Sequence, residues 1–259
     1  MPAEAYSWAN MDTHDTTLSA VTQGYQSQEV TYQVPLSAYP TATGVIIVNA
    51  PGAGEPKDGR DNRYAKIGGH LQDMAVGTLV THRGPLPDAQ SKYPDEPYSY
   101  RDASWNRISV EAMVHVIDYC KENAQMLCGS SSPTIHLAGF SAGGSVCGAV
   151  AFAYPEVSRI LLLSTYDSVG DYFYSGMRKF AGEVYLAYGS EDTMAGFLAY
   201  AMNFTAPELK ALNIKMVPDC DHGFRGATNG RILSKAFLWA FAGDESFPSP
   251  LGGIDLYNE

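Results

Sequence analysis

The chain has 259 residues, of which 45% are hydrophobic and 17% are charged, a composition typical of a folded globular protein and not of a disordered one. With 17 Lys and Arg against 28 Asp and Glu, the formal net charge is −11, so most of the surface repels nucleic-acid phosphates and anionic membranes. We therefore expect neither a nucleic acid nor a membrane as a partner, and the length fits one large α/β domain.

Residues 1–27 are polar with little periodicity, and we expect an irregular N-terminal arm there, ahead of a single domain over residues 28–259. From residue 29 onward, short apolar runs alternate with helix-like stretches. The predicted strands are 29–36, 45–48, 76–82, 134–138, 160–164, 183–188 and 214–218. The predicted helices are 62–74, 104–126, 142–153 and 229–242, the last with Gly243 as its C-cap. Several runs are continuously apolar, which predicts an α/β fold with a mostly parallel sheet flanked by helices on both faces.

Two connections bear on function. Residues 84–103 are rich in proline and tyrosine and follow the C-terminal end of a predicted strand, where open α/β sheets place their ligands. We expect the tyrosines of this connection to wall an apolar pocket. Residues 166–182 leave room for about one helix, so no large lid domain is expected.

The strongest motif is the GFSAG sequence at residues 139–143, which fits the GxSxG pattern. It stands directly after the apolar run IHLA and directly before a helix-like stretch, which is the strand–turn–helix context that a nucleophile elbow requires. The serine of such an elbow has a strained backbone, so the residues two before and two after it must be nearly without side chains. Ser141 is therefore the candidate nucleophile.

A serine hydroxyl needs a base, and the base needs an acid that orients it. His222 follows the predicted strand 214–218, and Asp192 follows the predicted strand 183–188, which gives the order Ser, Asp, His that an elbow of this kind predicts. Asp167, after the preceding strand, is a rival for the acid, and Glu191 is a weaker one.

The other five histidines fit the role of base less well. His136 lies inside a predicted strand and is expected to be buried and hydrogen-bonded, while His82 ends a strand and is a candidate to border the cleft. His70 and His115 fall on predicted helices, and His14 falls in the arm. The histidines form no HxxxH or HxH pattern and the four cysteines no CxxC pair, so we expect no metal. The loop at 52–54 lacks the third glycine of a dinucleotide site, Lys57 standing there, so no cofactor is expected.

Four segments together resemble the α/β-hydrolase superfamily, closest in style to compact serine esterases and dienelactone-hydrolase-like members. They are VIIVNAPGAG, the elbow GFSAGG, the acid loop YGSED and the histidine loop DHGF, and the resemblance covers about residues 29–242, most of the chain. The resemblance implies the α/β-hydrolase fold and a second oxyanion donor in the loop after the early strand. It assigns the donor amides to Ala142 and Ala53, with Gly52 or Gly54 as alternatives. Many relatives carry His-Gly in this loop, whereas this chain has Pro51 before Gly52.

The resemblance also implies a serine hydrolase that cleaves a small or medium carboxylic ester or thioester through an acyl-enzyme on Ser141. The partner would be a small-molecule acyl substrate. A biosynthetic acyltransferase or cyclase using the same three residues is the alternative, a peptidase ranks below it, and a binding module without activity below that. We expect a cytoplasmic protein, because no apolar run reaches the ~18 residues of a membrane span and the N-terminus lacks the pattern of a signal peptide. The oligomeric state is left open.

Overall fold

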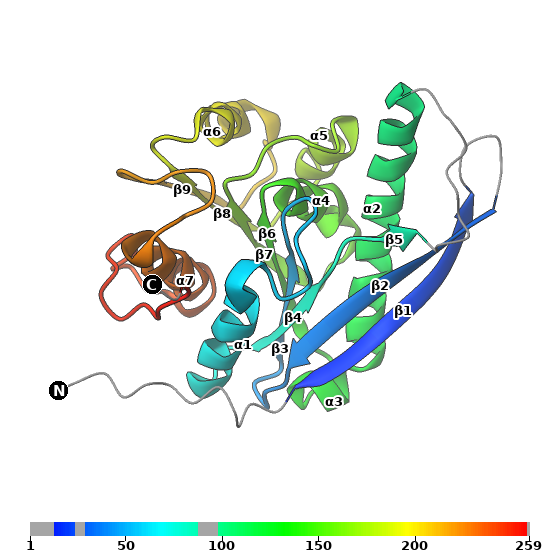
Figure 1. Ribbon diagram of the computed structural model, residues 1–259, viewed down its shortest axis with the longest axis horizontal. Coiled ribbons are helices and arrows are strands. Elements are labelled where there is room, and N and C mark those ends of the chain that lie inside the picture. The colour runs from blue at the N-terminus through cyan, green and yellow to red at the C-terminus, as the bar shows by residue number, and fades with distance from the viewer. Residues whose placement is uncertain (1–12, 24–28, 88–97, 258–259) are drawn as a thin grey trace.

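A computed structural model describes residues 13–23, 29–87 and 98–257. Within these ranges, nine strands form one sheet in the order β1-β2-β4-β3-β6-β7-β8-β9, with β5 also paired to β2 (Figure 1). The strands are β1 (His14–Gln23), β2 (Glu29–Tyr39), β3 (Val45–Ala50), β4 (Thr78–His82), β5 (Leu86–Pro87), β6 (Thr134–Phe140), β7 (Val157–Leu163), β8 (Glu183–Gly189) and β9 (Ala211–Val217). Along the sheet, the strands β4-β3-β6-β7-β8-β9 pair in parallel. The antiparallel pairings among the described strands are those of β2 with β1, β4 and β5.

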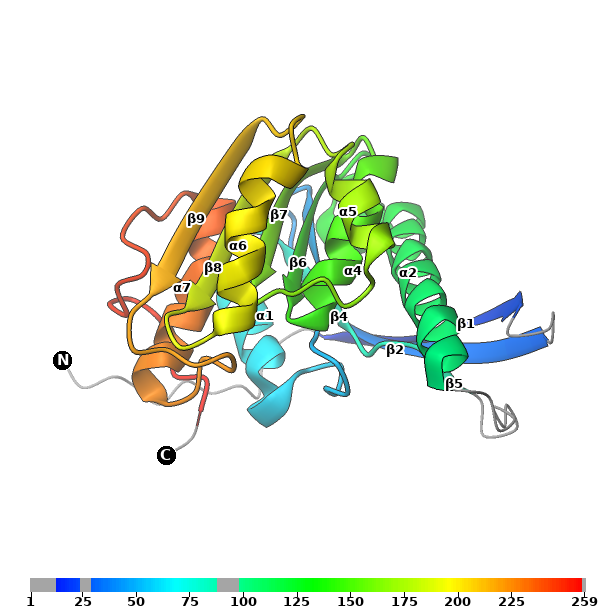
Figure 2. The same ribbon diagram turned by 90° about the horizontal axis from the view of Figure 1, so that it is seen from above.

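Helices cover both faces of this sheet, which confirms the predicted α/β architecture (Figure 2). One face carries α1 (Arg63–Asp73) and α7 (Ala227–Ala242). The other face carries α2 (Tyr98–Glu122), α4 (Ala142–Val150), α5 (Asp171–Met177) and α6 (Thr193–Thr205). A short helix α3 (Ala124–Cys128) and the 3-10 turns η3 (Arg60–Asn62) and η4 (Ala151–Ala153) complete the described elements.

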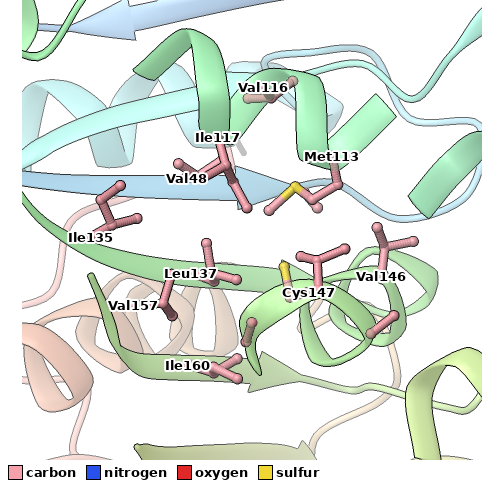
Figure 3. Packing of buried hydrophobic residues seen from close by; sticks show 14 of the residues in the cluster. Val48, Met113, Val116, Ile117, Ile135, Leu137, Val146, Cys147, Val157 and Ile160 are labelled. Carbon is pink, nitrogen blue, oxygen red and sulfur yellow. The ribbon is translucent and has the colours of Figure 1, made fainter. Parts of the chain in front are cut away.

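The central strands are held by two apolar clusters, one on each face. In β3, Val48 belongs to the cluster under α2 and α4, while Ile47 belongs to the cluster under α1 and α7. The predicted apolar stripe of α2 packs onto β3 and β6 through residues such as Met113 and Ile117, which lie against Val48 and Leu137 (Figure 3). Because both faces of each strand are buried, the strand sequences are continuously apolar rather than alternating. The ends of these strands are therefore rigid supports for the loops that follow them.

The expectation of an irregular arm over residues 1–27 is wrong for residues 14–23, which form β1. This strand pairs with β2 along its whole length, from His14 opposite Ala38 to Gln23 opposite Glu29. Its side chains alternate between half-buried and exposed, so the strand has no continuous apolar run and its backbone ladder holds it in place. Residues 1–12 and 24–28 lie outside the described ranges.

The predictions for the two connections, residues 84–103 and 166–182, have different outcomes. Most of 84–103 lies outside the described residues or is part of α2, which begins at Tyr98 instead of at the predicted residue 104. The expected pocket wall of tyrosines is therefore not described. The connection 166–182 contains one helix, α5, as predicted.

Candidate active site

The serine of the GxSxG motif lies at a sharp turn between β6 and α4. Ser141 has φ 55 and ψ −121, a backbone conformation that residues other than glycine rarely adopt, and the residue is buried. A Cβ on Gly143 would lie 2.0 Å from the carbonyl oxygen of Ala50, and one on Gly139 would lie 2.4 Å from the Cα of Gly144. Both positions need glycine, because the helix starts this close to the neighbouring strands. The backbone of Ser141 is held in turn by a 2.8 Å hydrogen bond from its N–H to Leu163 O.

The structure brings the three predicted side chains together. His222 Nε2 lies 3.0 Å from Ser141 Oγ, and His222 Nδ1 lies 2.6 Å from Asp192 Oδ2. The other oxygen of Asp192 accepts a hydrogen bond from Ala195 N, at 3.2 Å, in the first turn of α6. Asp192 is 5% exposed, and its carboxylate is held by the N-terminus of α6 on one side while it faces the imidazole on the other.

The loops that carry the acid and the base are joined to each other by their backbones. Glu191 N donates to Cys220 O at 3.0 Å, and Ser190 N donates to Val217 O at 2.8 Å. Gly189 makes this approach possible, since a Cβ there would lie 2.1 Å from Cys220 O. The loop after β8, which carries Asp192, and the loop after β9, which carries His222, are therefore held together by backbone hydrogen bonds.

The two rival acids face elsewhere. Asp167 is exposed, and its carboxylate accepts a 2.8 Å hydrogen bond from Tyr174 Oη. Glu191 is exposed as well. The carboxylate that His222 Nδ1 contacts is that of Asp192.

The loop after β3 forms a tight turn over residues 52–55. Glu55 N donates to Gly52 O at 3.1 Å, and Gly54 has φ +73, which suits glycine at the third position of a turn. The Glu55 carboxylate accepts the Gly52 N–H at 3.2 Å, so this amide is already engaged. Within the described residues no hydrogen bond uses the amides of Ala53 or Ala142, and Ala142 is the first residue of α4. Of the candidate donors, Gly52 is thus disfavoured.

Two cavities flank the serine. The first, of about 430 Å³, lies between the 52–55 turn, β4 and α4, and it is lined mostly by small and apolar residues, among them Ala53, Ala142 and Val146. The second, of about 550 Å³, is lined by Ser141 and His222 together with charged side chains that include Arg60 and Arg225. Gly52, Ala53 and Glu55 line both cavities, so the 52–55 turn separates them.

Two other histidines are buried. His82, at the end of β4, lines the first cavity, and its Nδ1 lies 3.1 Å from Arg83 O. His136, in β6, contacts Ser158 Oγ at 3.1 Å and stacks on Phe241, which confirms the prediction of a buried, hydrogen-bonded residue. Burial lowers the pKa of each imidazole to about 4, and for His136 the positive charge of Arg159 adds to the effect.

These two shifts predict that stability falls in acid. An unfolded chain binds protons at its histidines below a pKa of about 6.5, whereas the folded protein keeps these two imidazoles neutral down to about pH 4. The stabilisation is complete above pH 6.5 and is lost as the pH falls toward 4, by about 2 kcal/mol per histidine between pH 7 and pH 5. Urea unfolding of the wild type and of His136→Gln at both pH values tests this, because the variant should lose about 2 kcal/mol less. An equal loss in the two proteins would contradict the assignment.

A buried ion pair beside the site was missed by sequence reasoning. Glu55 closes the turn after β3 and Arg63 is the first residue of α1, and their side chains contact each other under the 52–55 turn. The only sequence signal is an acidic and a basic residue close behind a glycine-rich loop, a pattern too common to predict a contact.

The sequence and the structure were compared with those of known proteins. No family model matches the sequence, and no curated protein matches it. Solved structures do match over nearly the whole chain. A dienelactone hydrolase from Anabaena variabilis is 18% identical with a TM-score of 0.56, over 88% of this chain and 99% of that one. An α/β serine hydrolase homologue from Coxiella burnetii is 15% identical with a TM-score of 0.58, over 86% and 96%.

The chain has an α/β-hydrolase fold. Est1E from Butyrivibrio proteoclasticus shares it at 12% identity and a TM-score of 0.53, over 84% of this chain and 95% of that one. In the α/β-hydrolase sheet of the present protein, Ser141, Asp192 and His222 follow the C-terminal ends of β6, β8 and β9. No helix among the described residues is long and apolar enough to cross a membrane, and no three described His, Cys, Asp or Glu side chains are grouped so as to hold a metal ion.

Proposed function

We propose that the protein is a serine hydrolase that cleaves a small or medium carboxylic ester or thioester through an acyl-enzyme on Ser141. The observation that carries the proposal is the chain of contacts from Ser141 Oγ to His222 Nε2, at 3.0 Å, and from His222 Nδ1 to Asp192, at 2.6 Å. Both distances are within the range that proton transfer and its orientation require. The solved structures that share the fold include a dienelactone hydrolase and esterases, which supports the same class of reaction.

In the proposed mechanism, His222 Nε2 takes the proton of Ser141 Oγ as the oxygen attacks the carbonyl carbon of the ester. The same nitrogen then gives the proton to the leaving alcohol or thiol, and the acyl group stays on Ser141. Water attacks the acyl-enzyme with His222 again as base, which releases the carboxylic acid and restores the serine. Asp192 holds the proton of Nδ1 in place and stabilises the imidazolium while it exists.

The negative charge that develops on the carbonyl oxygen needs hydrogen-bond donors. We assign this role to the amides of Ala142 and Ala53, because both residues line the same cavity beside the serine and neither amide is engaged among the described residues. Ala142 N–H lies at the start of α4, where the helix dipole also favours negative charge.

Ala53→Pro tests the assignment of the Ala53 amide as an oxyanion donor. Ala53 is the second residue of the 52–55 turn, a position at which proline is favoured, so the substitution removes one N–H with little demand on the backbone. We expect kcat for an ester to fall by ~10²–10³-fold, the cost of one oxyanion donor, with a smaller change in KM. Ala53→Ser, which keeps the N–H, is the matched control and should retain kcat within a few fold. Equal activity of the proline variant and the control would remove Ala53 from the oxyanion hole.

Labelling tests the proposed function as a whole. A fluorophosphonate should form a covalent adduct on Ser141, located by mass spectrometry of the digested protein. Panels of esters, thioesters and amides then give the preferred bond, and product masses with and without an added amine or alcohol separate hydrolysis from acyl transfer. An adduct at any other residue would contradict the assignment of the nucleophile.

The four cysteines support a location in a reducing compartment, and we propose the cytoplasm. All four are free thiols and all are buried: Cys120, Cys128, Cys147 and Cys220.

Burial raises the pKa of Cys147 and of Cys220 to about 12, and in Cys220 the nearby acidic side chains, Asp221 first, add to the effect. Thiols held protonated in this way are poor nucleophiles, so serine, not cysteine, supplies the reactive group.

A further inference from the structure

Glu55 and Arg63 form an ion pair that is almost completely removed from solvent. Their side chains are 7% and 2% exposed, and one guanidinium nitrogen of Arg63, Nη2, lies 3.0 and 2.9 Å from the two carboxylate oxygens of Glu55. Arg60, exposed at the rim of the polar cavity, lies 3.9 Å from the same carboxylate. Removing charges from water costs several kcal/mol, so a buried ion pair is weak evidence for a role in stability. Its place in the fold points to another role.

The Glu55 end of the pair holds the turn that carries the proposed oxyanion donor. One carboxylate oxygen accepts the Gly52 N–H at 3.2 Å, while the backbone N–H of Glu55 returns to Gly52 O at 3.1 Å. These two hydrogen bonds join Gly52 to Glu55, the residues at the two ends of the turn that contains Ala53. The position of the Ala53 amide is therefore fixed by the position of the Glu55 carboxylate.

The Arg63 end reaches the loop that carries the proposed base. Its Nη1 lies 3.4 Å from Gly223 O and 3.4 Å from Tyr257 Oη, and Tyr257 Oη donates to the same Gly223 oxygen at 3.2 Å. Gly223 directly follows His222. The guanidinium carbon also lies 4.3 Å from the centre of the Phe140 ring, one residue before Ser141.

We propose that the Glu55–Arg63 pair positions the active site, by setting the distance between the oxyanion turn and the loop of His222 around the serine elbow. The inference rests on the proposed function. One rigid, planar guanidinium contacts all three loops at once, a geometry that lysine cannot reproduce. Neither Glu55 nor Arg63 touches a reacting atom in the proposed mechanism. They act through Ala53 and His222.

Three variants test the proposal: Glu55→Gln, Arg63→Met and the double variant. Glu55→Gln keeps the size of the side chain and an oxygen for the Gly52 N–H but removes the charge that holds Arg63. We expect kcat to fall about 10- to 100-fold in each single variant, with KM within about twofold of the wild type. The reason is that small displacements of the Ala53 amide or of His222 weaken binding of the transition state more than binding of the substrate. The rate constant for fluorophosphonate labelling of Ser141 should fall in parallel. Since the two residues act as one unit, the double variant should be no slower than the slower single variant.

Lys235→Met is the matched control. Lys235 is also buried and paired, with Asp244, but it lies on α7 away from the three loops. We expect this variant to lower the melting temperature while kcat and the labelling rate of the folded protein stay within twofold of the wild type. Circular dichroism shows that each variant is folded at the assay temperature. If Arg63→Met does not fold, the nearly isosteric Glu55→Gln still decides the question.

Two outcomes separate the inference from the proposed function. Wild-type protein that labels on Ser141, together with folded Glu55→Gln and Arg63→Met that label and turn over at the wild-type rate, would overturn the positioning role and leave the proposed function standing. Wild-type protein that is not labelled on Ser141 would overturn the proposed function, and the positioning role with it.

Discussion

Ser141→Ala should lower kcat/KM for the preferred ester by ~10³–10⁶-fold, because no other group can take the acyl chain once the hydroxyl is absent. The remaining rate would come from binding and from the oxyanion amides alone. Steady-state kinetics with a sensitive chromogenic or fluorogenic ester measures the loss, and the fluorophosphonate adduct should disappear from the same variant.

The fold should survive this change. Alanine keeps the Cβ that already occupies the strained backbone at φ 55, and only the hydrogen bond to His222 Nε2 is lost, a cost of about 0.5–1.5 kcal/mol. Ser234→Ala is a suitable control, since this buried serine on α7 bonds to Arg231 O and lies outside the site. It should remain active. Turnover by Ser141→Ala within tenfold of the wild type would mean that another residue is the nucleophile.

Asp192→Asn should reduce kcat by about 10⁴-fold with a folded protein. The amide is nearly isosteric, but it carries no negative charge to stabilise the His222 imidazolium, and it can hold the imidazole in the wrong tautomer. The bond from Ala195 N to the side-chain oxygen can persist, so the N-terminus of α6 keeps its cap. Steady-state kinetics and thermal unfolding of the same preparation separate the two effects.

Asp167→Asn makes the comparison decisive. Asp167 is the rival acid, follows the neighbouring strand β7 and bears the same change of one charge, yet its carboxylate is exposed and bonded to Tyr174 Oη. We expect its kcat within about twofold of the wild type. A large loss in Asp167→Asn and a small one in Asp192→Asn would transfer the role of the acid to Asp167.

The sequence predicted the central elements well because local and tertiary preferences agree there. Strands buried on both faces give continuous apolar runs, which located β3, β6 and β8 to within two residues at either end. Gly243 has φ +73 and ends α7 as predicted, since an αL position strongly favours glycine. The GFSAG motif predicted a sharp turn at Ser141 for a steric reason that the contacts of Gly139 and Gly143 now make explicit.

The elements that were missed lack such a signal. Helix α6 contains no charged residue, and it exposes Phe197 and Phe204 while it buries Leu198 and Met202, so both of its faces are apolar and it has no amphipathic period. Strand β1 is held by its backbone pairing with β2 and buries no side chain fully.

The Glu55–Arg63 pair shows a different limit. Each residue is charged, and charged side chains are ordinarily exposed, yet both are buried. The Arg63 contacts with Gly223 and Tyr257 join positions far apart along the chain. No local pattern encodes such contacts, because they exist only after the loop behind β3, the histidine loop and the C-terminal segment have come together.

The position of β9 at the border of the sheet has a consequence for heat tolerance. Among the described strands, β9 is an edge strand that pairs only with β8, and edge strands open at a lower free energy than central ones. His222 follows this strand, so a partial opening of β9 displaces the proposed base while the middle of the molecule stays closed. We therefore expect amide hydrogen exchange to be faster in β9 than in β6, and heating to inactivate the protein reversibly several degrees before its circular dichroism changes.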